Sequence, residues 1–206
     1  MSKVAVMTDS VSLLTPEIAE TYGITVVSTH ITMDGKDYLD TDINPSEFYA
    51  QLPQLREAEK FPTTSSPSIS DYLEAYRELG KKVKSILCVA YSPRLGIAYN
   101  AATKAKEMVR GKLDKVTIEI INSGSCCGAQ MLIALEAAKA AAKGKNGNKK
   151  LHAVINHANV PDEAEELKRR LLSRFDCAEL YVTPVLPLIA IHNGLGCIWL
   201  AWYGED

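Results

Sequence analysis

The chain carries no excess of positive charge, and this narrows its possible partners. Its 206 residues include 23 Lys and Arg against 25 Asp and Glu, giving a formal charge of −2 and a pI near 6.1. Nucleic-acid binding requires clustered Lys and Arg that neutralise phosphate groups. We therefore expect no nucleic-acid partner.

Long apolar runs are also missing. Crossing a bilayer takes about 20 consecutive apolar residues, and no segment approaches that length. The chain reaches an acidic residue, Asp9, close to its start, whereas a secretory signal needs a longer uncharged apolar stretch and a cleavage site. We therefore expect no transmembrane segment and a cytoplasmic location.

The common nucleotide and catalytic motifs are absent. There is no Gly-x4-Gly-Lys-Ser/Thr loop, no Gly-x-Ser-x-Gly elbow and no His-Glu-x-x-His helix. Gly194-Leu195-Gly196 begins like a dinucleotide fingerprint, but Trp199 stands where a small residue is needed, and a predicted strand follows instead of a helix. The sequence therefore predicts a protein that is not an enzyme and needs no cofactor.

Cysteines are few and odd in number: Cys88, Cys126, Cys127, Cys177 and Cys197. Most lie in apolar runs, so we expect reduced, buried side chains. The adjacent pair at 126 and 127 could form a redox or metal site. It lacks the Cys-x-x-Cys spacing and has no His nearby in sequence, so we expect no metal.

Strand-like and helix-like segments alternate along the chain. Apolar or β-branched runs predict strands over 3–7, 24–33, 36–39, 85–90, 116–121, 151–156, 179–183 and 197–203. Cap residues and Pro predict helices starting near residues 16, 45, 68 and 161, and helices are also expected over 95–110 and over the Ala-rich stretch 128–143. The stretch 61–68 is predicted to be a loop of hydroxyls flanked by prolines. This alternation predicts an α/β fold with a parallel, doubly wound sheet.

A polar, Gly- and Lys-rich stretch at 144–150 interrupts the pattern and predicts a linker or shortened surface connection. It separates an N-terminal α/β domain, residues 1–143, from a smaller second α/β domain, residues 151–206. The second part is too small to have much core of its own. We therefore expect it to pack on the first.

Hydroxyl-bearing residues follow several predicted strands. They stand at Thr8-Asp9-Ser10, Thr63-Thr64-Ser65-Ser66, Tyr91-Ser92-Pro93-Arg94 and Asn122-Ser123-Gly124-Ser125. Open α/β sheets bind ligands at the carboxyl ends of their strands, and hydroxyl donors suit a single carboxylate or phosphate in a partly apolar setting. The alternative is that these residues are only caps and turns, where Ser and Thr are common.

Two histidines are candidate ligand contacts. His157 follows a predicted strand, and His192 lies in what reads as a turn whose glycines, Gly194 and Gly196, permit close approach of the backbone to a ligand. A structural hydrogen bond is the alternative for each.

Together these segments resemble the DegV family of bacterial fatty-acid-binding proteins, some of which present the bound acyl chain to a fatty-acid kinase. The matching pieces, in order, are Thr8-Asp-Ser10, Tyr22-Gly-Ile-Thr-Val-Val27, Asp34-Gly-Lys36, Asp42-Ile-Asn-Pro-Ser-Glu-Phe-Tyr49, Pro62-Thr-Thr-Ser-Ser-Pro-Ser68, Leu95-Gly-Ile-Ala-Tyr-Asn100, Pro161-Asp-Glu-Ala-Glu-Glu-Leu167 and His192-Asn-Gly-Leu-Gly196 through Tyr203-Gly-Glu205. The resemblance implies a DegV-like α/β fold of two domains.

It also implies that hydroxyls hold a fatty-acid carboxylate while the acyl chain lies in a tunnel between the domains. The Thr-Ser of the family's Pro-flanked loop matches Thr64 and Ser65, and its His-Thr-Gly-x-Gly turn matches His192, Asn193, Gly194 and Gly196. The residues expected to bind ligand are Thr8, Asp9, Ser10, Thr63, Thr64, Ser65, Ser92, Gly96, His192, Asn193 and Gly194.

The chain departs from the family pattern at three places. Gly96 replaces a Ser that contacts the carboxylate, and Asn122 replaces an acidic residue. A segment of several tens of residues, which includes an Arg near the head group, is missing between Lys143 and Leu151. One hydroxyl-to-carboxylate bond contributes about 1.5–3 kcal/mol, and each buried methylene roughly 0.8 kcal/mol. We therefore expect the missing segment to matter more than the lost hydroxyl.

Three hypotheses about function follow. The leading one is a carrier of a long-chain fatty acid, whose phosphorylation, where it occurs, is done by a separate kinase. The second is an interaction or structural paralogue that has lost lipid binding. The third is a small-molecule hydrolase that uses His192 or the pair Cys126 and Cys127.

Overall fold

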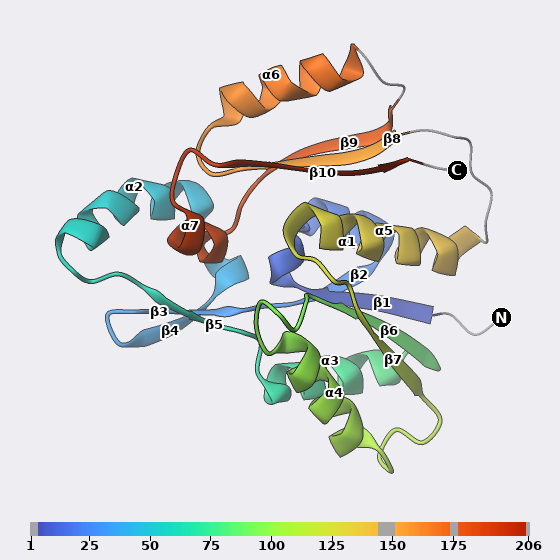
Figure 1. Ribbon diagram of the computed structural model, residues 1–206. Helices are drawn as coiled ribbons and strands as arrows, with labels where there is room; N and C mark the ends of the chain where they lie inside the picture. The colour runs from blue at the N-terminus through green and yellow to red at the C-terminus, as the bar shows by residue number, and fades with distance from the viewer. Residues whose placement is uncertain (1–3, 144–150, 174–176, 205–206) are drawn as a thin grey trace.

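The computed structural model describes residues 4–143, 151–173 and 177–204 (Figure 1). Its largest sheet is parallel, with strand order β2-β1-β6-β7. The strands are β1 (Val4–Asp9), β2 (Ile24–Val27), β6 (Ser85–Ala90) and β7 (Thr117–Asn122). Helices α1 (Pro16–Tyr22) and α5 (Cys127–Lys143) cover one face, and α3 (Ile69–Gly80) and α4 (Ala98–Val109) cover the other (Figure 1). The predicted doubly wound α/β fold is confirmed.

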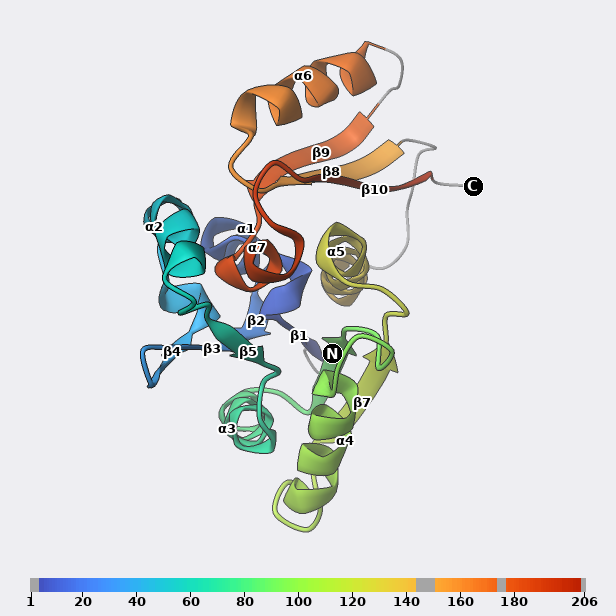
Figure 2. The same ribbon diagram turned by 60° about the vertical axis from the view of Figure 1, so that its left-hand side comes forward.

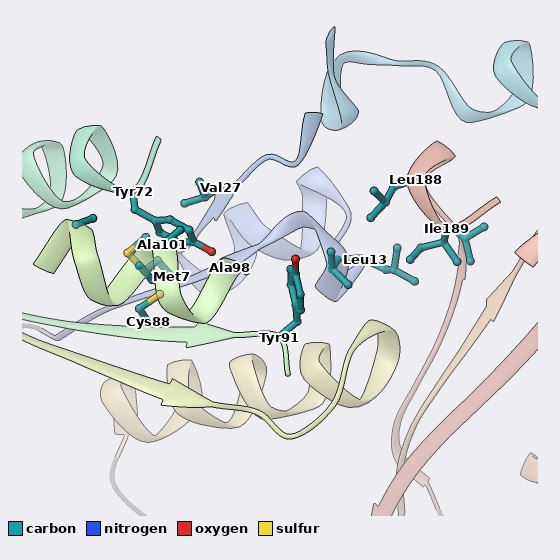
Figure 3. Packing of buried hydrophobic residues seen from close by; sticks show 14 of the residues in the cluster. Met7, Leu13, Val27, Tyr72, Cys88, Tyr91, Ala98, Ala101, Leu188 and Ile189 are labelled. Carbon is teal, nitrogen blue, oxygen red and sulfur yellow. The ribbon is translucent and has the colours of Figure 1, made fainter. Parts of the chain in front are cut away.

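The alternation of side chains along β1 builds two apolar cores. Successive strand residues point to opposite faces of a sheet. Met7 packs with Tyr72 of α3 and with Cys88 of β6 (Figure 3), whereas its neighbour Val6 packs in the core around α5. The helices are placed against both faces because each has an apolar stripe and a defined start, such as the capping box of Ser68 and Asp71.

A small antiparallel sheet, order β4-β3-β5, flanks the main one. It contains β3 (His30–Met33), β4 (Lys36–Leu39) and β5 (Thr63–Ser65), and helix α2 (Pro45–Glu57) leads from it. Asp34 and Gly35, both with positive φ, form the predicted tight turn. Two expectations were wrong: residues 24–33 form two strands in different sheets, and the predicted loop 61–68 contains β5, which pairs with β3.

The C-terminal part forms a third sheet, order β10-β8-β9. Its strands are β8 (Leu151–His157), β9 (Cys177–Pro184) and β10 (Ile198–Gly204); β8 runs parallel to β9 and antiparallel to β10. Helix α6 (Pro161–Leu172) covers the outer face, and α5 lies between this sheet and the parallel one (Figure 2). Val154 of β8 shares a core with Leu135 of α5, so the two parts pack together as expected. The predicted connection 144–150 lies outside the described residues, and the domain boundaries stay a prediction.

Helix α7 (Pro187–Asn193) was not predicted, because its residues were interpreted as a turn. Pro187 begins it, and Gly194, with a φ of 79°, ends it. The buried Asp40 carboxylate accepts a hydrogen bond from the Leu188 N–H at 3.2 Å, which fixes the start of the helix. The carrier of His192 is therefore a helix held from its N-terminal end.

The cysteines differ from expectation. Cys88 is buried, as predicted, but Cys126, Cys127, Cys177 and Cys197 are only half-buried. The apolar runs around them suggested full burial, yet all four lie outside the packed centres of the sheets or at the ends of elements.

Candidate functional site

A cavity of about 660 Å³ lies where the C-terminal part meets the rest of the chain. This volume is in the range of small-molecule sites. Its walls come from β5, the loop after β6, the first turn of α5, α7 and β10. The lining residues are Val11, Thr29, Thr64, Ser65, Ser66, Tyr91, Leu95, Cys126, Cys127, Gly128, Ala129, Asn156, Leu188, Ile189, His192, Asn193, Trp199, Leu200 and Ala201. The lining combines apolar side chains with neutral polar groups.

Four of the predicted site residues come together in this cavity: Thr64, Ser65, His192 and Asn193. Thr64 Oγ1 lies 2.9 Å from His192 Nε2, a hydrogen bond between residues far apart in the sequence. Strand β5 supplies one partner and helix α7 the other. In the tautomer with a proton on Nε2, the histidine donates to Thr64, and the threonine hydroxyl is left to donate to a ligand.

The polar residues around the end of β1 are buried, and their side chains make hydrogen bonds to other residues of the chain. Thr8 Oγ1 donates to the Val89 carbonyl at 2.8 Å and accepts from Gln130 Nε2 at 2.9 Å. Ser10 Oγ is 3.0 Å from Thr29 Oγ1. The structure therefore places Thr8 and Ser10 behind the cavity wall, outside its lining.

Asp9 is also fully buried. Its Oδ2 accepts the Tyr91 N–H at 3.1 Å, while Oδ1 has no hydrogen-bond partner among the described residues. Burial raises the pKa of this carboxyl from 3.8 to about 7. It therefore anchors the loop after β6 and does not face the cavity.

The remaining predicted residues lie beside the cavity. Ser92 is buried, and its Oγ accepts the Arg94 N–H at 3.3 Å. Thr63 is exposed on β5. Gly194 lines a different groove, between α2 and α7. Gly96 is not part of the lining but packs directly against Tyr91, which is.

Sequence reasoning missed several lining residues. Tyr91 and Ser66, whose hydroxyls are hydrogen-bonded to each other, were noted only as parts of loops. Asn156 is buried near the end of β8, where its Nδ2 donates to Thr183 Oγ1 at 2.7 Å. The rule that ligands bind at the carboxyl ends of strands would have drawn attention to Asn156 as well. Trp199 was excluded from a nucleotide motif but forms part of the apolar wall.

Cys126 and Cys127 line the cavity at the start of α5. A hydrogen bond from Cys127 lowers the pKa of the Cys126 thiol to about 7, and the same bond raises that of Cys127. A hydrolase would need a base next to this nucleophile. In the described part of the chain, the side-chain partner of His192 Nε2 is Thr64 and not a thiol.

One group of donor atoms resembles a metal site. Donor atoms of Glu136, His152 and Glu179 lie within 4.8 Å of one another. However, the Lys139 ammonium contacts Glu136 at 3.0 Å and Glu179 at 2.6 Å, so a cation already occupies the cluster. The group is an ion-pair network that joins α5 to β8 and β9.

His157, the other candidate histidine, accepts the Val160 N–H at 3.4 Å and does not line the cavity.

The sequence matches the sequence model of the DegV family, described as uncharacterised proteins, over residues 3–149. The chain belongs to the DegV family. A DegV domain-containing protein of Clostridium perfringens is 32% identical over 172 residues, covering 81% of this chain and 60% of that protein. One from Caldanaerobacter subterraneus is 35% identical over 145 residues, covering 70% and 49%. The chain thus spans about half the length of these DegV relatives.

Solved structures share the DegV fold. A DegV family protein from Thermus thermophilus, described by its fatty-acid binding, superposes with a TM-score of 0.86 at 18% identity, covering 98% of this chain and 100% of that one. DegV from Bacillus subtilis, described as a fatty-acid-binding protein, also gives 0.86 at 18%, covering 100% of both chains. Within the described ranges, no helix is both long and apolar enough to cross a bilayer.

Proposed function

We propose that this DegV protein binds one long-chain fatty acid in the cavity between its two parts. The observation that carries the proposal is the joining of a hydroxyl–imidazole pair, Thr64 and His192, to a largely apolar wall in one cavity. Membership of the DegV family supports it. So do structural neighbours described with bound vaccenic, stearic or heptadecanoic acid.

In this proposal, Thr64, Ser65, His192 and Asn193 surround the carboxylate. The acyl tail runs along the apolar lining formed by Val11, Leu188, Ile189, Trp199 and Leu200. Thr8, Asp9, Ser10 and Ser92 act indirectly, because their hydrogen bonds hold the strand ends and loops that carry the lining. Gly194 ends the helix that presents His192.

Affinity and specificity come from different ends of such a ligand. Each buried methylene contributes about 0.8 kcal/mol, so a long tail dominates the binding free energy. A hydroxyl donating to a carboxylate contributes about 1.5–3 kcal/mol and fixes the orientation of the acid. A protein that uses the cavity in this way is a carrier with no reaction of its own.

A substitution that fills the cavity tests the proposal. Ala201 of β10 lines the cavity, whereas Ala178 of β9 is exposed and outside it. We expect Ala201→Trp to abolish displacement of a fluorescent fatty acid by oleate, and Ala178→Trp to leave it unchanged. If both variants bind like the parent chain, the cavity is not the lipid site. If the protein is instead a paralogue that has lost lipid binding, the parent chain itself should bind no fluorescent fatty acid, and oleate should displace none.

The family resemblance adds a second part to the proposal: the bound acid is presented in the cytoplasm to a separate fatty-acid kinase. Acyl phosphate should then form only when ATP, kinase, fatty acid and this protein are all present. Formation without this protein, or none in the complete mixture with a kinase active on another carrier, would contradict this part.

A further inference from the structure

The phenol of Tyr91 is held firmly in the cavity wall. The residue is only 5% exposed, and its backbone N–H donates to the buried Asp9 carboxylate at 3.1 Å. The next backbone N–H, of Ser92, donates to the Ser125 carbonyl at 2.9 Å. Figure 3 shows the ring between the core around Cys88 and the side chains of Leu188 and Ile189. Tyr91 is therefore fixed at its backbone, and its hydroxyl is bonded to Ser66, which lines the cavity with it.

The Tyr91 hydroxyl can occupy its position because residue 96 is glycine. A Cβ on Gly96 would lie 3.0 Å from Tyr91 Cε2 and 3.1 Å from Cζ, and closer still to the hydroxyl oxygen. Side chains do not tolerate such contacts without displacement. Gly96 is not among the residues with positive φ, so the backbone does not require glycine there. The requirement is for space, and the phenol of Tyr91 fills it.

Counting hydrogens shows what this hydroxyl offers a ligand. Tyr91 and Ser66 have one hydroxyl hydrogen each, and their mutual hydrogen bond uses one of the two. One hydroxyl hydrogen of the pair is therefore left in the wall, and it is the Tyr91 hydrogen when Ser66 donates to the phenol oxygen. Burial raises the pKa of Tyr91, so the phenol keeps its proton at neutral pH. None of the described residues that line the cavity is Lys or Arg, and a bound carboxylate depends on such neutral donors.

We propose that the Tyr91 hydroxyl, held by Ser66 and given room by Gly96, donates a hydrogen bond to the carboxylate of the bound fatty acid. This inference rests on the proposed function. A hydroxyl is therefore still present where the side chain of residue 96 would lie, although residue 96 is glycine. Tyr91, five residues earlier in the chain, supplies it.

Removing one oxygen tests this assignment. We expect Tyr91→Phe to weaken oleate binding about 10-fold, equivalent to about 1.4 kcal/mol, and to change methyl oleate binding much less, because a neutral ester gains less from a donor than a carboxylate does. Tyr76→Phe is the matched control. Tyr76 is also buried, but its hydroxyl donates to the Ala102 carbonyl away from the cavity. That variant should lose stability and keep the parent affinity for oleate.

A paired exchange gives a second, independent readout. Gly96→Ser alone should weaken oleate binding, because the new side chain collides with the Tyr91 hydroxyl. Tyr91→Phe combined with Gly96→Ser removes the closest of the three contacts, the one with the hydroxyl oxygen, and adds a new hydroxyl at residue 96, so the double variant should bind oleate more tightly than Gly96→Ser alone. Parent-like oleate affinity in Tyr91→Phe, with oleate still binding the parent chain, would overturn the Tyr91 assignment alone. Absence of any fatty-acid binding by the parent chain would overturn the proposed function and this inference together.

Discussion

Replacing Thr64 by Val gives the sharpest view of how the cavity would hold a carboxylate. Valine keeps the shape of threonine but removes the hydroxyl that lies 2.9 Å from His192 Nε2. A hydrogen bond to a charged group contributes about 1.5–3 kcal/mol. The dissociation constant for oleate should therefore rise roughly 10- to 150-fold. Isothermal titration calorimetry on delipidated protein measures this directly.

The neighbouring residue supplies a matched control. Thr63 is exposed on the same strand and does not line the cavity, so Thr63→Val should leave the dissociation constant unchanged. Both variants should melt within a few degrees of the parent chain, because the Thr64–His192 bond is near the surface. An unchanged dissociation constant for Thr64→Val, or an equal loss for Thr63→Val, would refute the assignment of Thr64 to the head group.

Three further predictions concern titratable groups. Iodoacetamide should alkylate Cys126, whose pKa is lowered to about 7, much faster than Cys88, whose pKa burial raises to about 12; the Cys126 rate should rise between pH 6 and 8, and bound oleate should slow it. Glu179→Gln should lower the free energy of unfolding at pH 7 by about 1–3 kcal/mol, because Lys139 and His152 hydrogen-bond to Glu179 and, against the effect of burial, lower its pKa. Asp9→Asn should raise stability above pH 7 relative to the parent chain, because burial raises the Asp9 pKa from 3.8 to about 7 and ionisation opposes folding.

The signs of the two stability effects are opposite. A carboxylate whose pKa is lowered in the folded protein stabilises the fold at pH values above its pKa in the unfolded chain. The contribution of Glu179 to stability should therefore disappear as the pH falls below 4.5. A carboxyl with a raised pKa does the reverse, so the stability of the parent chain should fall between pH 4 and pH 7 through Asp9. Urea unfolding at several pH values measures both. A difference in unfolding free energy between Glu179→Gln and the parent chain that does not depend on pH would contradict the prediction for Glu179. A pH profile of stability for Asp9→Asn that matches the parent chain would contradict the prediction for Asp9. Equal alkylation rates with and without oleate would contradict the prediction for Cys126.

Local signals in the sequence predicted most of the regular elements. Asn44 and Ser68 cap helices as expected, and Asp34 with Gly35 makes the tight turn. These features depend on neighbours within a few residues, so they are readable from short patterns. The parallel sheet followed from the alternation of strands and helices.

Elements stabilised by distant partners were not predictable in the same way. Strand β5 has three residues, and it exists because the edge of β3 offers hydrogen-bond partners. Helix α7 has seven residues, too few to show a helical period, and Asp40, far away in the sequence, fixes its start. The Pro at its beginning and the Gly at its end were usable signals that the interpretation as a turn overlooked.

Several of the hydroxyls singled out in the sequence do stand at the ends of strands, but the direction of their side chains was not predictable. Thr8 and Ser10 stand at the end of β1, as expected, yet both turn into the protein because Gln130 and Thr29 offer them partners. Tyr91 is the opposite case, a residue that was not predicted to bind ligand and that lines the cavity. Its place in the cavity depends on a glycine five residues later, a steric relation that no motif records.

The account depends most directly on whether the purified chain carries a fatty acid. Native mass spectrometry, followed by organic extraction of the bound material, measures this without any assumption about residues. We predict a population heavier than the bare chain by the mass of one long-chain fatty acid, which delipidation removes and added oleate restores. A chain that purifies without lipid and takes up neither oleate nor palmitate would contradict the central claim.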